Sequence, residues 1–411
     1  MVVTSAEAGL FGRVDSVGVA DNRNGHHSIY IEEQVDVSYV DEQAGWRLAT
    51  ALSARLEDRA GGLFQGDIYH LYAEQSFNDG PLSAVKIGRM QRSDALGFYT
   101  LDGAQAWGEV SQLGAQKFTL YAGRPGRIDD FYMVEADLLL GAELQWDNRP
   151  LHYRFDTIEI ESINGRVELQ HLRKGASENR ISWSINGNGK LHQSSLSDLK
   201  LGFGGSYQFG QRQLEELLFS AEARRGRSEY LKLAYQSYSP SSPTLTFREQ
   251  YYSLYVLGQQ QEFAASYRLR PKNSLSWGAK GRLVTRENGL SGLGITGSLS
   301  QWQYFGADMS AQLDLLKLGS DNASTLYLEG ERPLSALRRL RAALVLQHQQ
   351  KQLAGDNNAF GFDGELEQML SSTLYLSVAL THIWNSRLND EYRYGVRLSY
   401  RFDDRKGWQS E

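Results

Sequence analysis

Residues 392–402 read Y-R-Y-G-V-R-L-S-Y-R-F, and this stretch decides the fold. Every second residue from Tyr392 to Phe402 is apolar or aromatic, and the residues between them are three arginines, a glycine and a serine. A period of two places the apolar side chains on one face of an extended strand and the arginines on the other. In a soluble sheet the apolar face would belong to the core. In a membrane barrel it would contact lipid, and the charged face would line a hydrated lumen.

The same alternation recurs along the chain. Residues 46–56, 138–146 and 374–380 each carry mostly apolar side chains at every second position. Short connections rich in Gly, Asn and Asp separate such segments, and these residue types favour tight turns. The pattern predicts roughly 20 to 24 strands of about 8 to 12 residues, the length that crosses a bilayer when a strand is tilted. Residues 212–225 have a composition that favours a helix, but the strand patterns around them predict a strand there too.

The composition agrees with a barrel wall and excludes several classes of protein. Aromatic residues make up 11% of the 411 residues, and Tyr and Trp are enriched where a barrel meets the membrane interfaces. Cys is absent, which excludes a thiolate metal site, a disulfide framework and covalent c-type haem attachment, and fits an oxidising, periplasm-facing compartment. The net charge of −6 includes no basic block, so no nucleic-acid partner is expected.

No apolar run is long enough for a transmembrane helix. At the N-terminus, Ala6-Glu7-Ala8 has the form of a signal-peptide cleavage site, and the alternative is a flexible start. We therefore expect residues 1–10 to be a residual signal or flexible N-terminus, residues 11–402 to form one barrel, and residues 403–411 to be a polar tail.

A soluble all-β protein is the alternative to a membrane barrel. The chain lacks the repeats of a propeller or a β-helix, and a sandwich would need Greek-key connections. A closed sheet of hairpins needs only short turns and leaves no exposed strand edge. The sequence therefore predicts an all-β fold with a single closed antiparallel transmembrane β-barrel and mostly short turns.

With this pattern, nearly the whole chain resembles the porin-like outer-membrane β-barrels of Gram-negative bacteria. Locally, Gly88-Arg89 followed by Leu101-Asp102-Gly103-Ala104 resembles a segment of several porin-like barrels. The outline also resembles the barrel sheaths of porin–cytochrome electron conduits. The resemblance implies an outer-membrane location, contact with membrane lipid and no enzymatic activity. Two features depart from it: only residues 89–102 could form a constriction loop, and nine polar residues follow Phe402.

The face opposite the apolar one carries charges of both signs, and these residues are the candidates for lining the lumen. They are Glu32, Asp36, Asp137, Glu143, Arg154, Arg268, Arg339, Arg341, Asp363, Glu365, Glu367, Arg397 and Arg401. A barrel of about 20 strands is too wide for its own side chains to fill, so it must hold water, a plug or a partner. We expect passive diffusion of small hydrophilic solutes, and the alternative is a sheath that encloses a multihaem cytochrome. If the barrel closes, Arg393, Arg397 and Arg401 should lie on the lumen wall, next to the first strand around Arg13.

A lipid hydrolase is the second alternative. His192-Gln193-Ser194 has the H-x-S spacing of outer-membrane lipid hydrolases, in which the imidazole activates the serine. Ser195-Leu196 follows where those enzymes have Asn-Gly, and no third residue is evident to orient His192. Adjacent residues of a strand point to opposite faces, so His26 and His27 make a poor metal site. The sequence therefore predicts no catalytic, cofactor-binding or metal site.

Overall fold

In its described residues, the computed structural model consists of β-strands joined by turns, and these residues form 23 strands. It describes residues 8–23, 26–58, 63–94, 96–110, 115–126, 136–148, 153–174, 176–192, 196–239, 260–271, 275–286, 289, 291–319, 321–349, 357–385 and 391–404. The strands are β1 (Gly9–Arg23), β2 (His26–Asp41), β3 (Trp46–Glu57), β4 (Leu63–Ser76), β5 (Leu82–Asp94), β6 (Gly97–Val110), β7 (Ala115–Gly126), β8 (Leu138–Asn148), β9 (Tyr153–Phe155), β10 (Ile158–Lys174), β11 (Ala176–Leu191), β12 (Leu196–Gln208), β13 (Gln213–Arg225), β14 (Glu229–Tyr238), β15 (Gln260–Leu269), β16 (Ser276–Arg286), β17 (Ser291–Tyr304), β18 (Ala307–Leu318), β19 (Asp321–Ser335), β20 (Arg338–Gln349), β21 (Asn358–Met369), β22 (Leu374–Asn385) and β23 (Glu391–Asp403).

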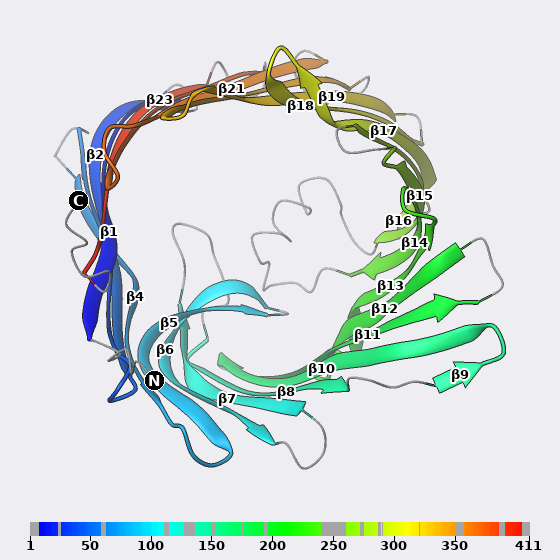
Figure 1. Ribbon diagram of the computed structural model, residues 1–411, viewed down its shortest axis with the longest axis horizontal. Coiled ribbons are helices and arrows are strands. Elements are labelled where there is room, and N and C mark those ends of the chain that lie inside the picture. The colour runs from blue at the N-terminus through cyan, green and yellow to red at the C-terminus, as the bar shows by residue number, and fades with distance from the viewer. Residues whose placement is uncertain are drawn as a thin grey trace, which may run out of the picture.

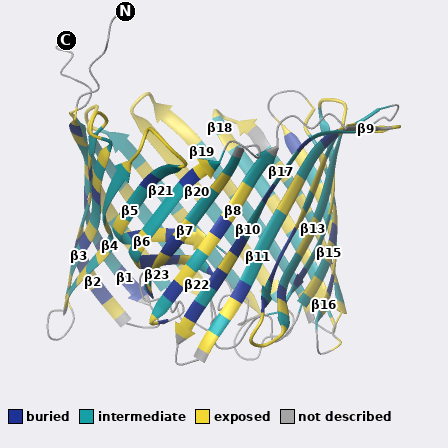
Figure 2. Cartoon of the chain, turned by 90° about the horizontal axis from the view of Figure 1, so that it is seen from below, coloured by how far each residue is buried: buried dark blue, intermediate teal, exposed yellow. Residues whose placement is uncertain are grey.

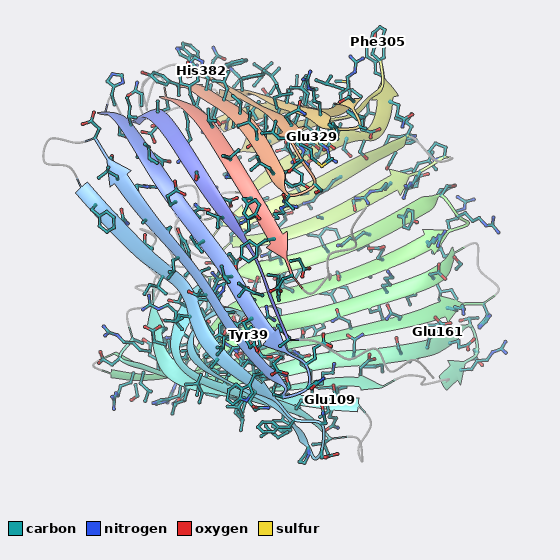
Figure 3. The ribbon with its side chains drawn as sticks, turned by 60° about the vertical axis from the view of Figure 1, so that its left-hand side comes forward. Tyr39, Glu109, Glu161, Phe305, Glu329 and His382 are labelled. Atoms are coloured by element: carbon teal, nitrogen blue, oxygen red, sulfur yellow. The ribbon has the colours of Figure 1, made fainter. Side chains whose placement is uncertain are left out.

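The strands form one closed antiparallel barrel. β9 pairs only with the first residues of β10, whereas β8 pairs with the rest of β10, so 22 strands make up the ring and β9 lies outside it (Figure 1). The ring closes where β1 pairs with β23, seen in Figure 3 as the salmon strand beside the violet one. In that pairing Arg13 is the partner of Arg401, which confirms the neighbours predicted for the first and last strands. The predicted all-β barrel is confirmed, and the strand number falls within the predicted range.

The ring strands are longer than expected. They span 10 to 17 residues, whereas about 9 to 11 residues cross the hydrocarbon of a bilayer, so the wall extends beyond it. Figure 2 shows the strands tilted and both termini at one end of the barrel, here called the terminal end. β9 also lies at the terminal end. The segment 213–225 is the strand β13, as predicted. No helix in the described part of the chain is long and apolar enough to cross a membrane.

The two faces of the wall differ in polarity. On β23 the side chains of Tyr394, Val396 and Leu398 are 52%, 48% and 40% exposed and share one face, while Arg393 and Arg397 share the other. Residues of the arginine face on β21, β23, β2, β3 and β4 line a single cavity, which is possible only on the concave, inner side. The apolar face is therefore the outer one, and the alternating register carries both faces around the ring.

Residues 89–102 are not an irregular loop. β5 continues to Asp94 and β6 begins at Gly97, so this stretch is the part of the β5–β6 hairpin that includes its tip. The hairpin leaves the line of the wall and curls into the ring (Figure 1). The prediction of a loop was wrong because the buried face of the hairpin carries the charged Arg92 as well as the apolar Met90 and Leu101, so the apolar alternation fails although the backbone is still extended.

Candidate functional site

The inward bend of the hairpin depends on glycines at the point where it leaves the wall. Gly88 on β5 has φ +126°, a conformation that a side chain makes unfavourable. A Cβ atom at Gly88 would lie 2.2 Å from the carbonyl oxygen of Leu71, and one at Gly103 would lie 1.9 Å from that of Ala122. Gly88 and Gly103 are cross-strand partners, so both strands of the hairpin bend together where the neighbouring backbones approach closely.

Between the bend and its tip, the hairpin packs on the inner side of the wall. Met90, Leu101 and Tyr99 of the hairpin are buried in one cluster with Leu139 of β8 and Leu172 of β10. Both wall residues lie on the inner, mostly polar face. Leu139 and Leu172 are cross-strand partners, and the residues next to them along each strand point outward. An apolar side chain on a hydrated inner face is favourable only when another group covers it, and the hairpin supplies that cover.

Arg92 fixes the hairpin to the wall through charge. Its side chain is buried, and Nη2 lies 3.2 Å from Oε1 of Glu168 on β10. The guanidinium carbon lies 3.5 Å from the centre of the Tyr121 ring on β7, a cation–π contact. The third contact is a hydrogen bond of 3.0 Å from Nη1 of Arg92 to the side-chain oxygen of Gln105. Arg92 therefore links the two strands of the hairpin and joins the hairpin to β7 and β10.

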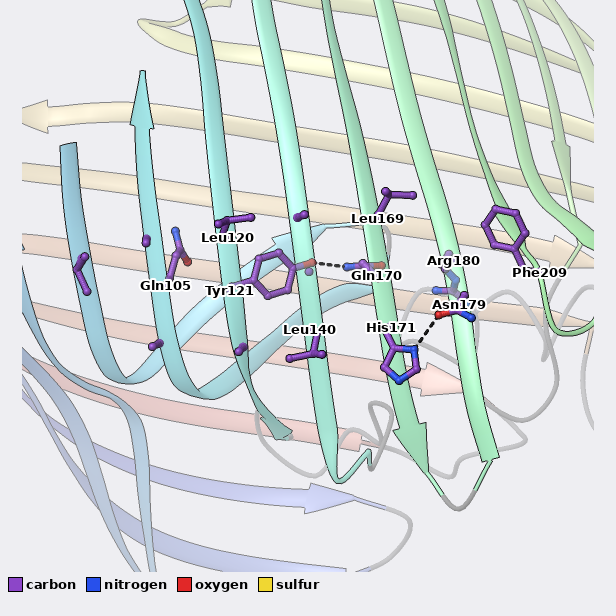
Figure 4. A pocket seen from close by; sticks show the side chains of 16 residues that line it. Gln105, Leu120, Tyr121, Leu140, Leu169, Gln170, His171, Asn179, Arg180 and Phe209 are labelled. Carbon is purple, nitrogen blue, oxygen red and sulfur yellow. Dashed lines mark hydrogen bonds between the residues drawn. The ribbon is translucent and has the colours of Figure 1, made fainter. Parts of the chain in front are cut away.

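The wall residues beneath Arg92 form their own network. The Tyr121 hydroxyl donates to Glu168 at 2.7 Å and accepts from Gln170 at 2.8 Å, and Figure 4 shows Tyr121 and Gln170 pointing toward each other. Nη2 of Arg166 lies 2.9 Å from Glu143 and 3.1 Å from Glu168. Buried charges are retained only when they are paired and hydrogen-bonded, and this network meets both conditions around Glu168.

A second ion pair closes the base of the hairpin. Arg89 and Asp102 face each other across β5 and β6, and two bonds of 2.6 Å join the guanidinium to both carboxylate oxygens. Bidentate pairs of this kind are geometrically specific. Both residues belong to the G-R and D-G motifs noted in the sequence, so the motif marks the base of the hairpin that enters the lumen.

The inner wall formed by β21 to β23 and β1 to β4 surrounds a polar cavity of about 750 Å³. Glu32, Glu365 and Arg397 of the predicted set line it, together with Arg55 and Arg393. Glu32 and Arg55 form an ion pair at 2.9 Å. A second hollow of about 650 Å³ contains Asp36 and Arg401, also from the predicted set. The structure thus brings five of the predicted residues to the two hollows beside the closing seam.

The other predicted residues are distributed around the ring. Arg339 and Arg341 of β20 both contact Glu331 of β19, at 3.2 and 3.0 Å. The inner face also holds Asp363, Glu367, Arg268 and Glu143, and exposed Asp137 immediately precedes β8. Arg154 lies on β9, outside the ring, and therefore not on the lumen wall. That the remaining residues line a conducting path stays a prediction.

The sequence analysis missed the residues that hold the hairpin: Arg92, Tyr121, Arg166 and Glu168. One signal was present, because Leu139 and Leu172 are apolar residues at inner-face positions of their strands. Such residues indicate that something covers the wall from inside. What covers them is separated along the chain by dozens of residues, and no local pattern identifies it.

The residues of the hydrolase alternative are only partly described. Nε2 of His192 lies 2.8 Å from Oε2 of Glu159, so a carboxylate does contact the imidazole. Ser194 lies outside the described residues, and no nucleophile can be placed beside His192. His27 contacts the ring of Tyr392 on the outer face. Within the described residues, no group of three or more His, Asp or Glu side chains is arranged to hold a metal ion.

Comparisons with known proteins show the fold. No protein-family model matches the sequence, and no curated protein matches it. Among solved structures, the siderophore receptor PirA from Pseudomonas aeruginosa matches with a TM-score of 0.64 and 12% identity, over 96% of this chain and 80% of that one. OccK5 (OpdH) from Pseudomonas aeruginosa has a TM-score of 0.42 and 10% identity, over 97% and 98% of the two chains. The translocation pore of the P pilus usher PapC has a TM-score of 0.44 and 8% identity, over 95% and 99%.

Proposed function

We propose that this chain, which has the fold of the Gram-negative outer-membrane barrels, is a channel of that membrane for small hydrophilic solutes. One observation carries the proposal. The ring of 22 strands encloses a lumen too wide for its own side chains to fill, and a hairpin fixed to the inner wall narrows it. A constriction that is held in place by buried charge supports selective diffusion rather than an unrestricted hole.

The charges of the inner wall support hydrophilic solutes. Arginines and carboxylates both line the two hollows beside the seam, and charged groups on a channel wall select solutes by charge and size. The proposed solutes therefore carry charge or several hydrogen-bonding groups. The channel itself needs no catalytic residue.

The alternative of a cytochrome sheath is not favoured. A sheath must leave its lumen free for a folded partner, whereas here the hairpin of β5 and β6 occupies part of that space (Figure 1). None of the solved structures reported above supports a haem-protein partner.

Conductance in planar bilayers tests the proposal. The purified barrel should give discrete, stable current steps in potassium chloride. A variant in which a two-residue Asn-Gly turn replaces residues 90–101, so that the cross-strand partners Arg89 and Asp102 flank the turn, should still insert and should give larger steps, because the part of the hairpin that narrows the lumen is gone. A folded, inserted barrel that carries no current would refute the channel, and equal step sizes in the two proteins would refute the constriction.

A further inference from the structure

The hydrogen-bond ladder of the ring has a break between β4 and β5. β4 pairs with β3 from Leu63 to Gln75, but it pairs with β5 only from Leu71 to Ser76. Residues 63–68 of β4 therefore pair with a neighbouring strand on one side only within the described part of the chain. Across the break, Nη1 of Arg89 donates to the carbonyl oxygen of Ile68 at 3.1 Å.

The break arises because the hairpin has moved far from β4. Arg92 of β5 contacts Glu168 of β10, which is four positions further around the ring than β5. The same guanidinium lies over the Tyr121 ring of β7, two positions further around the ring, so this part of the hairpin packs over β7 to β10 and not beside β4. Among the described residues, positions 63–68 of β4 therefore have no strand paired on that side, and they are here called the free edge of β4.

The free edge separates two different environments. Phe64 and Ile68 point outward and are 71% and 44% exposed, as expected of side chains in contact with lipid. Gln65, Asp67 and Tyr69 point inward and line the 750 Å³ cavity. Unpaired backbone is unfavourable in hydrocarbon and is tolerated where it borders a hydrated cavity. The edge of β4 therefore lies where the lumen meets the membrane.

The chemistry of the cavity favours an anionic group. Each of its carboxylates already has a partner: Glu32 has Arg55, Asp67 has Gln65, and Glu365 has Arg341. Arg393 donates one bond of 2.5 Å to the neutral hydroxyl of Tyr30. Arg397 has no ion pair within the described residues. These two guanidiniums keep donors available on the inner wall, and guanidinium is well suited to bind a carboxylate.

We infer that the break between β4 and β5 is a lateral opening that admits single-chain amphipathic carboxylates between the membrane and the lumen. The head group binds in the cavity beside Arg393 and Arg397, and the apolar chain passes the free edge of β4 among Phe64 and Ile68. This route is additional to the aqueous one of the proposed function, and it rests on the same barrel lying in a membrane. It assigns a second role to the hairpin, whose departure from the wall creates the opening.

Photo-crosslinking in nanodiscs tests the route. The probe is a hexadecanoic acid that carries a diazirine close to its carboxyl group, supplied with the lipids. Because the chain contains no Cys, single cysteines can be introduced and blocked selectively. The variant I68C places a thiol at the opening, and I295C is the matched control, an outward isoleucine of β17 that is paired on both sides. Each thiol is modified with a bulky polyethylene-glycol maleimide after folding.

The expected result is crosslinking to the inner-face residues Tyr69 and Tyr30, located by mass spectrometry, in both unmodified variants. Modification should remove these crosslinks in I68C and leave them unchanged in I295C. The inference is overturned if the unmodified barrels show crosslinks only on the outer face, or if modified I68C keeps its inner crosslinks. Ion conductance of the same samples is measured separately, so loss of the lateral route is distinguishable from failure of the channel.

Discussion

At the scale of single residues, the glycines at the base of the hairpin determine where the wall can bend. Gly103 has backbone atoms of Ala122 and Gly123 against the position of a Cβ, whereas Gly18 has no heavy atom within 4 Å of it. Both glycines lie inside strands, so a change to alanine alters strand propensity equally. The difference between them therefore reports on the close approach at the bend.

We predict that Gly103→Ala destabilises the barrel, by about 1–3 kcal/mol as for other overpacked sites, while Gly18→Ala leaves stability unchanged. The measurement is the temperature at which the folded barrel unfolds in detergent, followed by the mobility shift on gel electrophoresis. Equal unfolding temperatures for the two variants would contradict the proposed close packing.

At the scale of elements, the hairpin and the wall are held together by groups from distant strands. Alternation along a strand is a local property, and for this reason the sequence predicted the strands, the barrel and the position of the last strand beside the first. The hairpin was not predicted, because Met90 and Leu101 reach Leu139 and Leu172 only through the bend at Gly88. A residue whose burial depends on a bend elsewhere leaves no periodic signal.

Arg92→Met should release the hairpin without opening the ring. The change leaves Glu168 with one cation fewer, and removing one partner of a buried bond costs about 1–3 kcal/mol or more when charge is involved. Limited proteolysis should then cut near residues 92–97 in the variant and not in the unmodified barrel. Arg282→Met is the control, because Arg282 forms a comparable inner-wall pair with Asp314 at 2.6 Å, far from the hairpin. The idea fails if Arg92→Met is cut no faster than Arg282→Met.

At the scale of the whole molecule, the ring is joined by its first and last strands. Val14 and Tyr400 are cross-strand partners on the outer face, and partners in an antiparallel pair have the Cα separation that a disulfide requires. Gly18 has Val396 as its partner, four residues along β23 from Tyr400, which is about 13 Å.

The double variant V14C/Y400C should therefore form a disulfide on oxidation, and G18C/Y400C should not. Since the chain has no other Cys, the crosslinked form is recognised by its faster migration after denaturation without reductant. Crosslinking in both variants, or in neither, would show that the register of the closing seam is different.

The closing seam also determines the order in which the protein can be completed. Until residues 391–403 arrive, β1 and β22 each present an unpaired edge, and such edges recruit other strands. The entropic cost of joining distant ends grows only logarithmically with length, so the length of the chain is a small obstacle. The larger obstacle is the order of synthesis, because β1 is made before β23 and one of its edges must be kept from other strands until β23 is available. A chain that stops before β23 loses the pairing of two neighbours at once, so closure of the ring depends on this one strand.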